Sequence, residues 1–187
     1  MNTAREVLQF WFGDSPGERR KAWFVKDPEF DGEIRARFLV LYEAAARGEL
    51  EGWKNAAESA LALIVLTDQF PRNMFRSEAR AFATDARALA TARHITASGW
   101  DRSMRPVERM FVYLPYEHSE VLADQEISLQ LFAPLGAFDE TKDTPDFARR
   151  HWEIVKRFGR YPHRNAALGR PGTPEEIEFL KQPGSGF

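Results

Sequence analysis

The stretch WKNAAESALALIVLTD, residues 53–68, decides the fold class of this chain. It contains the longest apolar run of the sequence, residues 60–66, and its apolar side chains fall on nearly every face of a helix. Such a helix is stable only when other elements enclose it, because each apolar face has to be removed from water. We therefore predict a central helix over 53–68 that other helices surround.

The segments on either side of this stretch carry helix start and stop signals, such as a capping residue before an apolar stripe and a glycine after it. Thr173, with Glu176 three residues on, has the form of a capping box. No run alternates between apolar and polar residues like a strand, so the predicted fold class is all-α, with about eight helices. They are expected over residues 3–13, 27–48, 53–68, 77–98, 106–114, 119–132, 144–158 and 173–180.

A chain of 187 residues is most simply one domain, and we predict a single helical domain over 1–187. Residues 134–143 are the candidate for a subdomain break. Residues 159–172 have no helical period, and an aperiodic segment of this length inside a compact domain is usually functional or packed by its own side chains.

Composition and charge exclude several classes of function. The chain has no cysteine, which excludes disulfides, thiolate metal sites and cysteine nucleophiles and fits a cytoplasmic location. A net charge of -2 argues against nucleic-acid partners, and the apolar run 60–66 is far shorter than the ~18 residues that span a membrane. The histidines lack metal-motif spacing and no glycine-rich phosphate loop occurs, so neither a metal nor a cofactor is expected.

Two short patterns occur twice. VLTDQ at 65–69 returns as VLADQ at 121–125, and FPRN at 70–73 resembles YPHRN at 161–165. Repeated patterns at corresponding places in a helical chain are typical of helix pairs that are arranged alike. The sequence therefore favours a helical-repeat-like architecture.

Asp68 and Asp124 fall on the apolar stripes of their predicted helices, so both carboxylates are expected to be buried. A buried charge without a partner is very unfavourable, and arginine is the natural partner because its planar fork matches a carboxylate. Both acids should therefore draw arginines inward from other parts of the chain.

Arginine and asparagine side chains cluster in two segments, each near the start of a predicted helix. We expect them to form a polar pocket for a small anion or an acidic peptide segment, which makes the chain a binding module. The alternative is structural, in which they satisfy buried carboxylates and open carbonyls at helix ends. The pocket residues are Arg72, Asn73, Arg76, Arg160, Arg164, Asn165 and Arg170.

The dense group of acid and base residues at 117–120 suggests a second function. His118, with Glu117 or Glu120 as its orienting partner, would serve as the general base of a hydrolase-type acid/base enzyme. The competing interpretation is structural, with His118 in a loop just before a helix start.

Several of these motifs together resemble the bacterial family known as domain of unknown function 924. The resemblance runs nearly end to end and implies an all-α fold of antiparallel helix pairs in a tetratricopeptide-like, right-handed array, with no agreed activity. Tyr161 stands where the family pattern has Phe. The motifs that carry the resemblance are VLQFWFG at 7–13, LTDQFPRN at 66–73, RMF at 109–111, HSE at 118–120, RYPHRN at 160–165 and LGR at 168–170.

Overall fold

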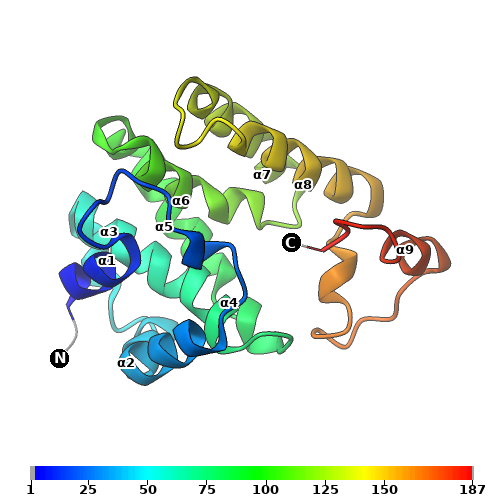
Figure 1. Cartoon of the computed structure of the whole chain (residues 1–187), viewed down its shortest axis with the longest axis horizontal. Coiled ribbons are helices and arrows are strands. Elements are labelled where there is room, and N and C mark those ends of the chain that lie inside the picture. The colour runs from blue at the N-terminus through cyan, green and yellow to red at the C-terminus, as the bar shows by residue number, and fades with distance from the viewer. Residues whose placement is uncertain (1–2, 187) are drawn as a thin grey trace.

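The computed structural model describes residues 3–186, and no strand occurs among them (Figure 1). The predicted all-α fold class is confirmed. Short 3-10 turns and one π-helical turn connect the α-helices. The α-helices are α1 Ala4–Phe12, α2 Pro28–Ala46, α3 Ala57–Ile64, α4 Phe70–Met74, α5 Asp85–Ala97, α6 Pro106–Glu117, α7 Leu122–Phe132, α8 Thr144–Phe158 and α9 Pro174–Phe179.

Local capping signals explain where three of these helices begin. The Thr3 side chain accepts from Glu6 N at 3.3 Å at the start of α1. Asp27 caps α2 by accepting from two backbone N–H groups of its first turn. The predicted capping box at α9 is confirmed, because Glu176 N donates to Thr173 Oγ1 at 3.2 Å and Thr173 N donates back to Glu176 Oε2 at 2.7 Å.

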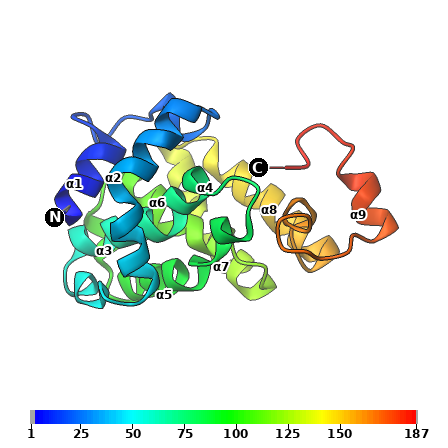
Figure 2. The ribbon, with the colours of Figure 1, turned by 90° about the horizontal axis from the view of Figure 1, so that it is seen from below.

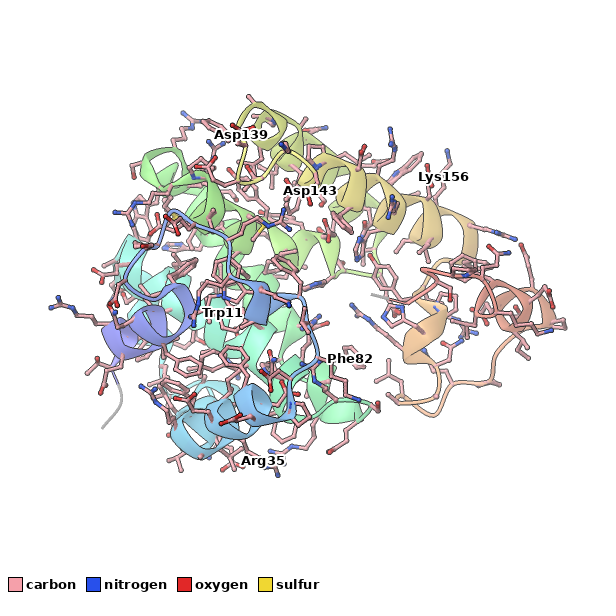
Figure 3. The ribbon with its side chains drawn as sticks, viewed as in Figure 1. Trp11, Arg35, Phe82, Asp139, Asp143 and Lys156 are labelled. Carbon is pink, nitrogen blue, oxygen red and sulfur yellow. The ribbon has the colours of Figure 1, made fainter. Side chains whose placement is uncertain are left out.

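The core is built around α3, as the apolar run predicts. Residues 60–66 are all at most 4% exposed. Helix α3 packs against α1, α5 and α6, and Figures 1 and 2 show it next to α1. Trp11 lies among the N-terminal helices in Figure 3 and is fully buried. Burial of apolar side chains from several helices around this element is the main source of stability.

The predicted helix over 53–68 is wrong in its bounds. It is divided into a 3-10 turn at Glu51–Asn55, helix α3 and a π-helical turn at Val65–Gln69 that continues directly into α4. Pro71 explains the π-helical turn, because proline has no N–H to bond the Thr67 carbonyl one turn earlier and its ring crowds that carbonyl. The Thr67 oxygen instead accepts from Thr84 Oγ1 at 2.6 Å.

Two further predicted helix starts are also wrong. Ser77 is a non-glycine residue with a positive φ of 64°, and the α-helix expected from residue 77 begins only at Asp85. The helix expected from Ser119 begins at Leu122, because the Ser119 hydroxyl donates to Asp124 and accepts from Val121 N. In both places the sequence predicts that a serine caps a helix, whereas in the structure the serine lies in a turn before the helix begins.

Consecutive helices pack on one another in the second half of the chain. Helix α5 packs on α6, α6 on α7 and α7 on α8, while α9 lies to one side (Figure 2). Helices α7 and α8 contact each other across the connection 134–143, the predicted subdomain break. The tetratricopeptide-like array and the single domain over 1–187 stay predictions.

Candidate functional site

A fully buried carboxylate, that of Asp68, lies at the centre of the candidate site. Its Oδ1 lies 2.8 Å from His118 Nδ1 and 3.3 Å from Arg72 Nη1, and its Oδ2 accepts from Gln69 Nε2 at 2.6 Å. Burial opposes ionisation, but the charge of Arg72 and the contacts with His118 and Gln69 outweigh it and hold the pKa of Asp68 well below its usual range. Asp68 is therefore ionised at neutral pH.

This carboxylate begins a chain of hydrogen bonds that joins separate elements. Arg72 donates to both oxygens of Asp85, at 2.9 and 3.0 Å, in the bidentate geometry that makes such pairs strong. Arg164 Nη1 donates to the same Asp85 Oδ2 at 3.2 Å. His118 is the C-cap of α6, Asp68 lies in the π-helical turn, Arg72 in α4, Asp85 at the start of α5 and Arg164 in the 3-10 turn Pro162–Arg164.

Arg164 is held inside the protein, and one of its donors is buried without a partner in the described structure. It is 6% exposed, and its guanidinium lies over the rings of Phe82 and Tyr161, 4.7 and 4.6 Å from their centroids. Burial and the nearby Arg72 lower the pKa of Arg164, although a guanidinium stays charged in proteins. Its Nε has no hydrogen-bond partner within residues 3–186. In Figure 3, Phe82 lies on the side of the helical body that faces the orange C-terminal segment.

These side chains border a cavity of about 400 Å³. No acidic residue is among the described residues that line it, because the carboxylates of Asp68 and Asp85 lie behind the arginines. Four lining residues are cationic and three are histidines, so the wall is positive or neutral throughout. The lining residues are Lys26, Arg72, Arg76, Ser77, Ala81, Phe82, His118, His151, His163, Arg164 and Ala167.

Three of the seven arginine and asparagine residues named from the sequence line this cavity: Arg72, Arg76 and Arg164. Arg76 is anchored by a bidentate pair with Asp31, at 2.5 and 2.8 Å. Asn73 donates to the same Asp31 at 2.7 Å, so it supports the wall from behind.

The other three, Arg160, Asn165 and Arg170, do not line the cavity. Arg160 binds Glu176 with two hydrogen bonds, at 2.6 and 2.8 Å, and Asn165 donates to the same carboxylate at 3.3 Å. Arg170 binds Glu120 at 2.7 and 2.9 Å. Their geometry matches the structural alternative, in which they hold the segment 159–172 against the fold.

The structure corrects the expected partner of His118. Glu120 accepts from Arg170 and from Tyr161 N, at 2.7 to 2.9 Å. Glu117 is 3% exposed and lies 3.2 Å from His151 Nδ1. The carboxylate that contacts His118 is Asp68, 50 residues earlier in the chain, and helix α6 brings the two together by ending at His118.

Asp124, the second carboxylate expected to be buried, is 3% exposed and pairs with Arg93 Nη2 at 2.5 Å. The Ser119 hydroxyl donates to its other oxygen at 2.8 Å. Asp124 is not among the residues that line the cavity. Its arginine therefore has an architectural role.

The cavity also uses residues that the sequence did not single out for the site. Asp85 has the pattern of an ordinary first-turn acid, and Lys26 that of an exposed loop residue. His151 and His163 showed no motif spacing. Burial lowers the pKa of His151 to about 3 and that of His163 to about 4, so both rings are neutral at neutral pH.

Glu117 gives a testable pH dependence beside this site. Burial, with the nearby charge of Asp68, raises the pKa of Glu117 from 4.5 to about 8. A carboxyl group whose pKa is raised by folding contributes its full stability at pH values below its pKa in the unfolded chain. This contribution is lost as the pH rises through its pKa in the folded protein. Between pH 6.5 and 9 we expect the ionisation of Glu117 to lower the free energy of unfolding by roughly 2 kcal/mol. Histidines that are neutral in the folded state oppose this fall by up to about 0.4 kcal/mol each between pH 6.5 and 7.5, as their protonation in the unfolded chain ends, and they do so equally in every variant.

The measurement is urea denaturation at several pH values in this window, with Glu117→Gln as the test variant. Glutamine has nearly the same shape and no ionisable group, so this variant should not show the fall, and the difference between its profile and that of the unsubstituted protein gives the contribution of Glu117. Glu153→Gln, at an exposed position of α8, is the control and should keep the slope of the unsubstituted protein. An equal slope in Glu117→Gln would show that another group causes it.

Two kinds of feature are absent from the described residues. Within 3–186 there is no group of three or more His, Asp or Glu side chains arranged to hold a metal ion. Across the same residues, no helix combines the length and the apolar character that crossing a membrane requires.

Comparisons with known proteins agree with the resemblance seen in the sequence. The model of a family described as bacterial protein of unknown function (DUF924) matches residues 7–184. The chain is also similar to the solved structure of a protein of unknown function from Agrobacterium tumefaciens, at 42% identity and a TM-score of 0.86, covering 95% of this chain and 96% of that one. No curated protein matches the chain. Because the family model spans nearly the whole sequence, this chain belongs to the DUF924 family of bacterial proteins.

Proposed function

We propose that the chain is a binding module whose cavity takes a small anion with a phosphate or carboxylate group. The observation that carries this proposal is the composition of the cavity wall, which has four cationic side chains and three histidines and no acidic side chain among the described residues. Arginine forks match phosphate and carboxylate oxygens in a bidentate manner. A site with this wall attracts anions and disfavours cations.

The arginines are also held in place before a ligand arrives. Asp85 anchors Arg72 and Arg164, and Asp31 anchors Arg76. Such anchoring reduces the loss of side-chain freedom on binding, which would otherwise weaken the affinity. Arg164 Nη2 makes no hydrogen bond within residues 3–186, so it is the donor of this side chain that an anion oxygen in the cavity would use.

The volume of the cavity favours a small ligand. About 400 Å³ lies near the lower end of the range of roughly 300 to 1,000 Å³ that is typical of small-molecule sites. The acidic peptide segment that the sequence also allowed would need a longer groove. A short glutamate-rich peptide is therefore expected to bind no better than a free dicarboxylate such as succinate.

The proposal predicts a thermal shift with inorganic phosphate or succinate. At a ligand concentration of 100 times Kd the folded state gains about 2.7 kcal/mol, which raises Tm by about 5–10 °C for a domain of this size. The reference is sodium chloride at equal ionic strength. Arg164→Gln should remove most of the shift, because it deletes the buried guanidinium at the cavity wall.

Two further variants make the result decisive. Arg149→Gln is the matched control, since Arg149 is exposed in α8 and pairs only with Asp146 in the described structure. Lys26→Gln tests the cavity without disturbing buried groups, because Lys26 is exposed and forms no ion pair within residues 3–186; it should weaken binding several-fold. If no anion raises Tm above the chloride reference, or if both cavity variants keep the full shift, the proposal fails.

A further inference from the structure

The orientation of His118 in the cavity has a chemical consequence. Asp68 is ionised and only accepts hydrogen bonds, so the contact of 2.8 Å places the ring proton of His118 on Nδ1. The other ring nitrogen, Nε2, then carries a lone pair. An imidazole in this tautomer, fixed by a carboxylate, is a nucleophile or a base at its Nε2.

The Nε2 atom has no hydrogen-bond partner within residues 3–186. The Nδ1 side of the ring faces a carboxylate that is 0% exposed, and the His118 side chain, 14% exposed, lines the cavity. The ring edge that carries Nε2 is therefore the edge that faces the cavity.

The nearest cation to His118 is Arg72. Arg72 Nη1 and His118 Nδ1 contact the same oxygen of Asp68, at 3.3 and 2.8 Å, so the guanidinium and the imidazole are neighbours. Arg164 is joined to Arg72 through Asp85. An anion in the cavity would lie beside both guanidinium groups and the His118 ring, because all three line it.

The reactivity of that central atom separates the two classes of anion. The carbon of a carboxylate ion resists attack by a nitrogen nucleophile, whereas the phosphorus of a phosphate monoester is attacked once cations neutralise its oxygens. Guanidinium groups supply this neutralisation by position and charge alone. Of the anions that fit the proposed binding site, phosphate esters are the class on which His118 can act.

We propose that the cavity is a phosphoryl-transfer site for small phosphate monoesters, with His118 Nε2 as the nucleophile and Asp68 as its positioning residue. This inference rests on the proposed anion binding. Nε2 attacks phosphorus, a P–N bond forms and the P–O bond to the alcohol breaks, with the departing oxygen taking a proton from water. A second water then attacks phosphorus, the P–N bond breaks and inorganic phosphate leaves.

The experiment uses the whole chain and p-nitrophenyl phosphate, whose leaving group departs without an acid catalyst. We expect release of nitrophenolate and, after rapid quenching with 32P-labelled substrate, a label on the protein that is stable to alkali and labile to acid. Peptide mapping should place this label on His118. His118→Gln should reduce both signals to background, whereas His94→Gln, at an exposed histidine that does not line the cavity, should change neither.

The positioning role of Asp68 has its own readout. Asp68 raises the proton affinity of the His118 ring, so Asp68→Asn should move the acid limb of the pH–rate profile to lower pH and slow nitrophenolate release on the order of 10²- to 10⁴-fold. A role in folding alone would reduce the amount of active protein and leave the acid limb in place. An unmoved limb overturns the assignment of Asp68.

The two proposals fail in distinguishable ways. If inorganic phosphate raises Tm in the unsubstituted protein but neither nitrophenolate nor label forms, the binding function stands and phosphoryl transfer is overturned. Transfer by His118 is also overturned if His118→Gln, folded and still shifted by phosphate, releases nitrophenolate at the original rate. If inorganic phosphate does not raise Tm and p-nitrophenyl phosphate leaves no label on the protein, both proposals are wrong.

Discussion

Replacing Asp68 by alanine should lower the free energy of unfolding by about 3–5 kcal/mol, because the change breaks a buried ion pair from one side. Arg72 would lose one of its two carboxylate partners, and His118 would lose the only acceptor that its Nδ1 contacts in the described structure. The effect is large because the Arg72 guanidinium would stay inside the protein without the negative charge of Asp68. The measurement is urea denaturation at pH 7 followed by far-UV circular dichroism.

Asp146→Ala is the control for this prediction. Asp146 also pairs with an arginine, Arg149, but the two side chains are 65% and 61% exposed. Exposed pairs of this kind contribute roughly 0–1 kcal/mol. A loss below about 1 kcal/mol in Asp68→Ala would mean that the ion pair of Asp68 stabilises the fold no more than a surface pair does, which would contradict this prediction.

Trp11→Ala should cost a similar amount, about 3–5 kcal/mol, through lost packing. Trp11 is fully buried, and its removal leaves a void that the surrounding helices cannot fill. Its ring lies within 5.5 to 6.1 Å, between centroids, of four other aromatic rings. These rings belong to Trp23, Phe30, Phe70 and Phe111.

Far-UV circular dichroism is the suitable signal here as well, because the substitution removes a fluorophore. Val40→Ala serves as the control, since Val40 is 80% exposed and the same kind of truncation there should change stability by less than about 0.5 kcal/mol. Trp11→Phe should lose less than Trp11→Ala, because it keeps most of the ring and removes an indole N–H that has no partner in the described structure. Equal losses in these two Trp11 variants would contradict a packing origin.

The parts of the fold that the sequence predicted correctly depend on neighbours along the chain. Capping at Thr3, Asp27 and Thr173 acts within three residues, so the residue pattern alone shows it. The burial of residues 60–66 follows equally from composition and period, since no arrangement of helices leaves so apolar a segment in water.

The errors arose where a local signal competes with a tertiary contact. The π-helical turn at Val65–Gln69 depends on Pro71 and on a hydroxyl from Thr84, which lies 17 residues after the carbonyl it bonds. Ser77 has the composition of a helix cap, yet it lies in the left-handed region at the cavity wall. Residue types do not reveal which of these contacts the folded chain makes.

The residues of the candidate site were also predictable in part, whereas their pairings were not. Its acidic centre, Asp68, and three of its arginines were named from the sequence, because a carboxylate on an apolar stripe requires a cation. The partners of each group were not predictable. The chain has 26 Lys and Arg residues for 28 Asp and Glu residues, so composition allows very many pairings.

The sequence by itself determined the all-α fold, several helix starts and the burial of one central helix, since these depend on side-chain patterns along a few turns. Only the tertiary structure decided that His118 contacts Asp68, 50 residues earlier, and that Asp85 joins Arg72 to Arg164, which lies 79 residues after Asp85. A hydrogen bond forms only within about 3 Å, and packing of the helices sets which groups come that close.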